Sequence, residues 1–275
     1  MLRKSLKYDF KSILKFWWII ALISIAFSLI GSTFIFILNS ELALPDFIEV
    51  MAGFSLFFIF MALTLLTLIT FILIFARFYK NFFSDEGYLT FTLPVKRIHL
   101  LNSKLIMSTV MTIATYVLIV FDILLMLVIP FASEVFSKHF WDGFKEMFSV
   151  FYKDLGIFLF IYPLEILVIL LLMVVFSNLF LFCCISFGCT IVKRGKIFAA
   201  IGIYYGANSI VSTIIQIFYT FGIGSLAQWL SPIPDNAFAL VIALLLLGII
   251  FFIAIFCAIL YALQYFMMDR KLNLS

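Results

Sequence analysis

Residues 77–104 read RFYKNFFSDEGYLTFTLPVKRIHLLNSK and form the longest polar interruption between two apolar runs of membrane length. We call this segment the handle. Charged residues stand near both of its ends, Gly87 suits a turn, and Pro94 suits the first position of a new helix, where its missing N–H costs nothing. The pattern predicts a loop outside the membrane that joins two membrane-spanning helices, and its basic residues favour the cytoplasmic side.

The handle also carries more large apolar side chains than a solvated loop has reason to expose. These side chains are Phe82, Phe83, Tyr88, Leu89 and Phe91. The lipid headgroup layer, where aromatic residues are common, is one cover that fits them. A partner protein that docks from the cytoplasm is the other, and the residues alone leave both open.

The composition is that of an integral membrane protein. Hydrophobic residues make up 66% of the 275 residues and charged residues 12%, whereas about 25% of the residues of a soluble domain are charged. Such a chain holds several spans of about 20 residues and leaves little for a soluble domain, so we expect one transmembrane domain over residues 1–275. The net charge of +4 does not indicate a nucleic-acid partner, because the basic residues stand at the ends of apolar runs.

The apolar runs predict an all-α membrane protein with six transmembrane helices. The expected spans are residues 16–38, 52–76, 105–131, 156–191, 197–224 and 237–268. Each is long enough to cross a bilayer at about 1.5 Å per residue. The fourth is longer than a bilayer requires, so we expect it to tilt, to project or to break near Pro163.

The distribution of Lys and Arg predicts the orientation of the spans. Fifteen of the eighteen Lys and Arg residues fall in the N-terminal segment, the handle, residues 193–196 and the C-terminal tail. The alternate connections hold the other three, which stand beside acidic residues. Because cytoplasmic flanks are rich in positive charge, we expect a multi-pass protein of the plasma membrane, in contact with the lipid bilayer and with both termini in the cytoplasm.

Two connecting segments have the spacing of amphipathic helices. In residues 2–15, apolar side chains at helical spacing alternate with five Lys and Arg residues, which predicts a helix on the anionic inner leaflet. In residues 132–153, seven apolar side chains recur mostly every three or four residues, which predicts a second such helix on the outer face. A similar short element is expected near residues 226–230.

Small polar residues follow one helical face in several spans. Examples are Ser24, Ser28 and Ser32 in the first span, Ser108, Thr112 and Thr115 in the third, and Asn208, Ser212 and Gln216 in the fifth. Such residues either join packed helices or line a wet pathway, and Asn208 and Gln216 are the costlier ones to leave facing lipid. Gly202 and Gly206 form a small-xxx-small face on the fifth span, which nominates it for close packing within one chain or across a dimer.

Asp122 and Glu165 are the ionisable side chains set deepest in the expected spans, where charged groups are costly and usually face a cavity or a partner. Each lies about 13 Å from the outer side, at about 1.5 Å per residue, so the two are able to be neighbours. Repulsion and desolvation would then keep at least one of them protonated. They form either a polar patch on a translocation route or neutral carboxyl groups bonded to backbone carbonyls.

The residues that catalysis or metal binding would need do not occur in usable patterns. The chain has no G-x-x-x-x-G-K-[ST] phosphate loop and no H-E-x-x-H motif. Its two histidines, His99 and His139, fall on opposite predicted sides of the membrane, and its four cysteines lie inside apolar runs. We therefore expect a protein that is not an enzyme and has no metal site.

The handle resembles the loop between the second and third spans of ABC-2 type permeases, the membrane subunits of ATP-binding-cassette exporters. The resemblance rests on Arg77 followed by F-x-x-x-x-F-S-D-E-G-Y-L-x-F-T-L-P-V, the basic pair at 96–97 and the L-L-N-S-K that ends at Lys104. A second similar patch, LFCCISFG at 181–188, precedes the basic turn at 193–196. The six-span plan matches over the whole chain, although a large extracellular domain and a fused nucleotide-binding domain are missing.

In this family the loop supplies a coupling helix that sits in a cleft of a separate ATPase subunit, and an amphipathic N-terminal elbow helix precedes the first span. The resemblance therefore implies that the handle is covered by that ATPase rather than by lipid. The residues that it assigns to ATPase coupling are Phe83, Asp85, Glu86, Gly87, Tyr88, Leu89, Phe91 and Pro94. ATP and Mg²⁺ would be bound by the ATPase, and this chain would bind no cofactor of its own.

The resemblance also implies a second permease, identical or paralogous, and an export pathway between the two. Asp122, Glu165, Asn208, Ser212 and Gln216 are the candidate pathway residues. One alternative is a transporter driven by an ion gradient, in which Asp122 and Glu165 bind the proton or cation. Another is a membrane scaffold or sensor that recruits a cytoplasmic protein without moving a substrate.

Overall fold

The computed structural model describes residues 2–39, 45–84, 87, 97–192, 195–230 and 235–270, and within these ranges it contains eight helices and no strand. The helices are α1 (Leu2–Asn39), α2 (Asp46–Phe83), α4 (Arg97–Val128), α5 (Ala132–Val135), α6 (Lys138–Leu155), α7 (Phe158–Ile191), α8 (Lys196–Leu230) and α9 (Asp235–Arg270). Six of them are long and apolar enough to cross a membrane, namely α1, α2, α4, α7, α8 and α9. The predicted all-α fold with six helices able to span a membrane is thereby confirmed for the described residues.

The spanning helices are longer than the predicted spans. They contain 32 to 38 residues, which gives lengths of about 48–57 Å against about 30 Å of bilayer hydrocarbon. α2 continues beyond Ala76 to Phe83, and α4 begins at Arg97 rather than near Leu105. The two ends of the handle are therefore helical, because buried apolar residues continue the pattern of each helix.

α7 passes through Pro163 without a break, so of the three alternatives for the fourth span, namely tilt, projection or a break, the break is absent. The helix begins at Phe158, and Pro163 lies inside it, with its ring exposed. A proline removes one backbone hydrogen bond and is tolerated best close to the start of a helix. Here its ring also displaces no packed side chain.

The chain divides into two compact units. Unit 1 comprises Met1–Ala76 and Ile106–Val150, and unit 2 comprises Arg77–Leu105 and Phe151–Ser275. α2, α4 and α6 each contribute residues to both units. The expectation of a single transmembrane domain stays a prediction.

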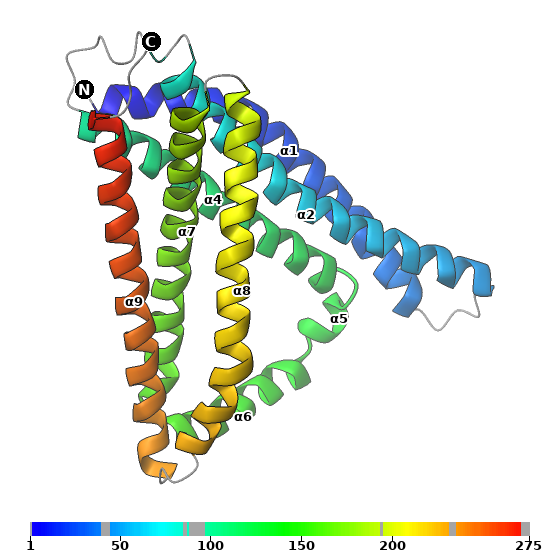
Figure 1. The fold of residues 1–275 in the computed structure, drawn as a ribbon. Coiled ribbons are helices and arrows are strands. Elements are labelled where there is room, and N and C mark those ends of the chain that lie inside the picture. Colours follow the sequence, from blue (N-terminus) through cyan, green and yellow to red (C-terminus); the bar gives the residue numbers. More distant parts are fainter. Residues whose placement is uncertain are drawn as a thin grey trace. The chain divides into compact units, whose positions relative to one another are not determined.

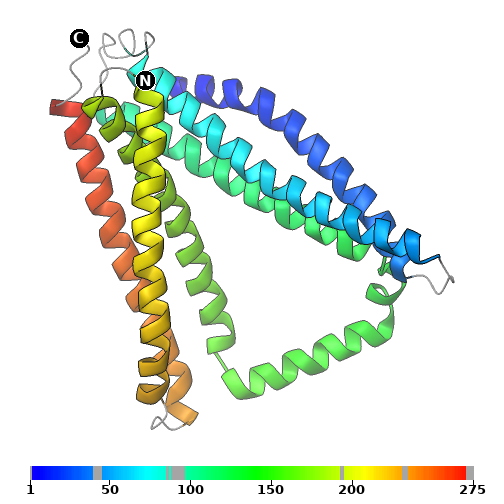
Figure 2. The ribbon, with the colours of Figure 1, turned by 45° about the vertical axis from the view of Figure 1, so that its right-hand side comes forward.

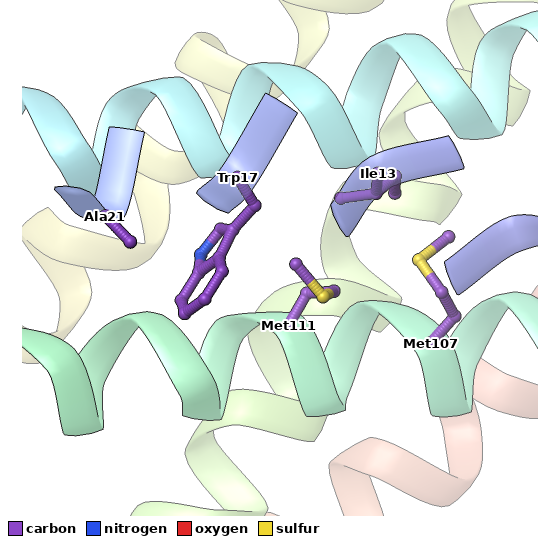
Figure 3. Packing of buried hydrophobic residues seen from close by; sticks show 5 residues of the cluster. All are labelled: Ile13, Trp17, Ala21, Met107 and Met111. Atoms are coloured by element: carbon purple, nitrogen blue, oxygen red, sulfur yellow. The ribbon is translucent and has the colours of Figure 1, made fainter. Parts of the chain in front are cut away.

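In unit 1, α1 packs in parallel against α4. Ile13, Trp17 and Ala21 of α1 form a buried cluster with Met107 and Met111 of α4, and Figure 3 shows the two sets advancing in the same direction. The parallel packing brings the beginnings of the first and third spans to the same end of unit 1. If successive spans cross the membrane in opposite directions, the first and the third must run in the same direction, as α1 and α4 do.

The predicted amphipathic segment at residues 2–15 is the first part of α1 and not a separate helix. Its apolar residues Leu6, Phe10 and Leu14 pack against the Trp17–Met111 cluster, while its lysines at 7, 11 and 15 are exposed. The apolar face expected to lie on lipid is thus covered by α4. A position of the basic face on the inner leaflet stays a prediction.

α1, α2 and α4 run alongside one another in unit 1 (Figures 1 and 2) and approach closely at Gly31. A Cβ atom placed on Gly31 would lie 2.9 Å from Met126 Cε and 3.1 Å from Ile59 Cδ1. The absence of a side chain at Gly31 therefore lets the three helices converge.

In unit 2, α7 packs against both α8 and α9 (Figure 1). α7 approaches α8 closely at Gly188, where an added Cβ would lie 2.5 Å from Ala200 Cα. An added Cβ at Gly202 or Gly206 would meet nothing within 4 Å. The predicted small-residue contact at Gly202 and Gly206 therefore does not form with the described residues of unit 2.

The predicted amphipathic helix at 132–153 is present as α5 and α6, which are separated at residues 136–137. Gly156 ends α6 with a φ of 55°, and its N–H donates to the Tyr152 carbonyl oxygen at 2.8 Å. α6 has no buried residue. Residues 226–230, expected as a short separate element, belong to the end of α8.

Candidate functional site

Two of the predicted ATPase-coupling residues, Phe83 and Gly87, belong to the described part of the handle. Asp85, Glu86, Tyr88, Leu89, Phe91 and Pro94 lie outside the described residues. The structure therefore describes the base on which the handle stands. We define the handle base as residues 77–83 of α2 and 97–105 of α4, together with the side chains of α7 and α9 that they contact.

An aromatic stack joins α2 to α7 at the handle base. The ring of Phe78 lies parallel to the ring of Phe182, with centroids 3.9 Å apart and an angle of 7° between the planes. Phe82 is fully buried and lies 4.9 Å from Phe78, and the partly buried Phe83 lies 6.3 Å from it. The cover of Phe82, left open by the sequence, is therefore supplied by the chain itself and by neither lipid nor a partner.

Gly87 folds back against the end of α2. Its N–H donates to the carbonyl oxygen of Ser84 at 2.7 Å. A Cβ atom at this position would lie 2.7 Å from the carbonyl oxygen of Phe82, a backbone atom that has little freedom to move. Gly87 is also buried, so its role in the structure is to let the chain turn tightly and not to contact a partner.

Three polar contacts tie α4, α9 and α7 together at the same base. Arg97 Nη1 donates to the carbonyl oxygen of Met268 at 2.8 Å, next to the negative end of the α9 dipole. The Tyr261 hydroxyl donates to Asn102 Oδ1 at 2.7 Å. The third contact, from Gln264 Nε2 to Ser186 Oγ at 2.8 Å, is buried between α9 and α7. The start of α4 is thereby fastened to α9, and α9 to α7.

Lys104, one of the residues that carry the family resemblance, is buried in the handle base. Ser103, its neighbour in sequence, and Asn81 of α2 are also buried, and all three have interaction partners in the structure. Buried polar groups of this kind are stable only when they are paired. Sequence reasoning treated Lys104 as a cytoplasmic flanking charge, and hydropathy alone carries no signal of its burial.

The handle base suits mechanical connection rather than catalysis. Its closely packed rings and short polar contacts resist local deformation, because protein interiors are packed as densely as crystals. A displacement of the handle would therefore move the ends of α2 and α4 together with α7 and α9. Among the described residues, no group of three His, Cys, Asp or Glu side chains is placed to hold a metal ion.

Asp122 is fully buried in unit 1, where the Ser24 and Ser28 side chains of α1 face its carboxyl group. Neither of its carboxyl oxygens has a hydrogen-bond partner among the described residues. It therefore lines no open pathway within unit 1, and it is not bonded to a backbone carbonyl. Glu165 of α7 is also buried, with an unpaired Oε2, and belongs to unit 2. The proximity of the two carboxyl groups stays a prediction.

The polar residues of the fifth span are exposed. Asn208, Ser212 and Gln216 all lie on the open surface of α8. Gln216 belongs to a face on which small and polar residues recur at alternating four- and three-residue steps, and Asn208 and Ser212 adjoin that face. Its residues are Gly202, Gly206, Ser209, Thr213, Gln216 and Thr220. In the most apolar window of α8, 6% of the residues are buried, against 17% to 33% in the other five spanning helices. Within unit 2, the described residues therefore leave this polar face uncovered.

No protein family, curated protein or solved structure matches this chain. The fold and the candidate site are accordingly defined by the chain's own residues. The likeness of the handle to the loop of ABC-2 type permeases stays a prediction from its motif.

Proposed function

We propose that the chain is the membrane-spanning permease subunit of an ATP-binding-cassette exporter. In this proposal it forms the substrate pathway with a second permease in the plasma membrane, with both termini in the cytoplasm. A separate ATPase subunit binds the handle and supplies the energy. Six apolar helices, the handle motif and the distribution of basic residues support this assignment.

The observation that carries the proposal is the packing of the handle base. Phe78 stacks on Phe182, and Arg97 is bonded to Met268, so both ends of the handle are attached to spanning helices other than their own. A partner that pulls on the handle would thus act on α2, α4, α7 and α9 at once. Closure of an ATPase dimer would supply such a pull and favour one of two access states of the spans.

The polar face of α8 supports a pathway that is completed by a second permease. An amide such as Asn208 or Gln216 is costly to leave in hydrocarbon, so an exposed set of them on a spanning helix calls for a polar neighbour or water. A second permease placed against α8 would provide this cover. Substrate would then pass between surfaces rich in Ser, Thr, Asn and Gln.

Replacement of two handle residues tests the proposal. We expect the E86A/Y88A variant to lose ATPase binding, because both side chains belong to the motif assigned to the ATPase cleft. The affinity-tagged chain would be purified from its native membranes, and Mg²⁺-dependent ATP hydrolysis would be measured in the eluate. The matched control, D142A/K145A, changes an exposed charge pair on α6. Equal ATP hydrolysis by both variants and the wild type would contradict the proposal.

A transporter driven by an ion gradient is the second candidate, and the buried Asp122 favours it. Such a protein would move its substrate when this chain alone is reconstituted in vesicles with an imposed gradient of protons or sodium. The permease assignment predicts no transport under those conditions. It predicts transport only after the ATPase and ATP are added.

A further inference from the structure

The carboxyl group of Asp122 occupies the middle of the contact between α1 and α4. Toward the beginnings of these helices, Trp17 Nε1 donates to Thr115 Oγ1 at 3.0 Å. Toward their other ends, Gly31 lies against Met126. Packed contacts on both sides explain why Asp122 is 0% exposed.

No charged residue of the surrounding spans is available to neutralise Asp122. Residues 16–39 of α1, 50–76 of α2 and 106–128 of α4 contain no other Asp, Glu, Lys, Arg or His. Tyr116 is the other titratable residue of these segments, and its side chain is half exposed. Ser24 and Ser28 lie on the part of α1 between the Trp17–Thr115 and Gly31–Met126 contacts, and their side chains interact with the Asp122 carboxyl group. An ionised carboxylate without a counter-charge is strongly disfavoured in such surroundings.

The hydroxyl groups of Ser24 and Ser28 each donate a hydrogen bond to a backbone carbonyl of α1. Ser24 Oγ donates to the Ala21 carbonyl oxygen at 2.9 Å, and Ser28 Oγ donates to the Ile25 carbonyl oxygen at 2.8 Å. A hydroxyl has one proton to donate, so both serines present lone pairs to Asp122. Lone pairs accept a hydrogen bond from a carboxylic acid and repel a carboxylate. The arrangement therefore matches the protonated form of Asp122.

We propose that Asp122, Ser24 and Ser28 form a proton-binding site between α1 and α4. Neither carboxyl oxygen is hydrogen-bonded to a described residue, and with the proton bound a small shift lets the carboxylic acid donate to a serine oxygen and link the two helices. The proton leaves when α1 and α4 separate enough to admit water, or when the serine hydroxyls turn away from their backbone carbonyls toward the carboxylate. The site is a property of this chain by itself and does not depend on coupling to an ATPase.

Infrared spectroscopy of the purified full chain in lipid nanodiscs at pH 7 tests this proposal directly. A protonated carboxylic acid has a carbonyl-stretching band that a carboxylate lacks. We expect the wild type to show such a band and Asp122→Asn to lose it. Asn has the size of protonated Asp and carries no charge, so this variant should retain the packing of α1 on α4. Glu165→Gln, which changes the other buried carboxyl group with an unpaired oxygen among the described residues, serves as the control and should retain the band.

The Ser24→Ala/Ser28→Ala variant identifies the band independently if Asp122→Asn fails to fold. Removing the oxygens that accept the Asp122 hydrogen bond should move the carbonyl frequency without abolishing the band. Identical acid bands in the wild type and both Asp122-site variants would overturn the proposal. A wild-type band that appears only after sodium and potassium are replaced by choline would also overturn it, because the site would then bind a metal cation.

Discussion

At the residue scale, single atoms decide how closely the helices pack. Gly188 has no side chain at the point where α7 approaches the backbone of Ala200, whereas Gly202 has open space around it. The two glycines are indistinguishable by helical spacing, because both fit a small-residue pattern. Only the position of the neighbouring helix separates a packing glycine from one that is free to change.

Gly188→Ala should therefore destabilise the protein, and Gly202→Ala should not. The added methyl group at 188 meets a backbone atom of α8, and overpacking of this kind costs about 1–3 kcal/mol. At 202 the methyl group meets nothing, and replacement of a helical glycine by alanine favours the helix by about 1 kcal/mol. Thermal unfolding of both variants in one detergent measures the difference. Equal melting temperatures would contradict the assigned α7–α8 contact.

At the scale of the elements, the handle base explains why α2 and α4 continue beyond their predicted ends. Phe78 and Phe82 of α2 are buried within unit 2, and so are Leu100 and Leu101 of α4. Burial of each such side chain contributes about 1.5–3 kcal/mol, which stabilises extra helical turns past the apolar run. A hydropathy window ends at the first charged residues and does not detect these turns.

Phe78→Ala should weaken the handle base much more than Phe57→Ala affects the same helix. Loss of the Phe78 ring removes the stack on Phe182 and leaves a cavity, at a cost of about 3–5 kcal/mol. Phe57 is exposed on α2, so its removal leaves no internal cavity. Limited proteolysis of the handle in membranes reports the effect, and Phe78→Ala should be cleaved faster. Equal cleavage of the two variants would argue against a packed base.

α6 should lie in the outer membrane interface with its aromatic face in lipid. Its apolar residues share one helical face while Asp142 and Lys145 occupy another, and none of its residues is buried in the protein. Nitroxide labels at Phe144→Cys and Asp142→Cys would distinguish the two faces, because the native cysteines are buried. We expect oxygen to relax the label at 144 and a water-soluble nickel chelate to relax the label at 142. Equal relaxation at both positions would contradict an interfacial helix.

At the scale of the whole molecule, hydropathy and charge were sufficient to predict six spans and an all-α fold. Each span is a long apolar run, and length alone distinguishes such a run from a core helix. The partners of the buried faces could not be predicted in the same way. Periodicity shows that a helix has a buried face, but it does not show that Phe182 covers Phe78 or that Lys104 is buried.

The candidate site was predictable in part for the same reason. The depth of Asp122 in its span follows from counting residues, whereas its serine surroundings depend on the parallel register of α1 and α4. Asn208 and Gln216 predicted a face of α8 that is buried or wet, whereas both side chains are exposed in the structure. The described residues of unit 2 do not cover this face, and a second permease is the cover that we propose.

Photocrosslinking from the handle tests the central claim most directly. Tyr88 would be replaced by p-benzoylphenylalanine, intact cells would be irradiated, and the captured protein would be identified by mass spectrometry. The same replacement at Phe144, on the predicted outer face, is the control. The account predicts that position 88, and not position 144, captures a cytoplasmic ATPase with a G-x-x-x-x-G-K-[ST] phosphate loop. Capture of lipid alone at position 88, or of the same protein at both positions, would contradict it.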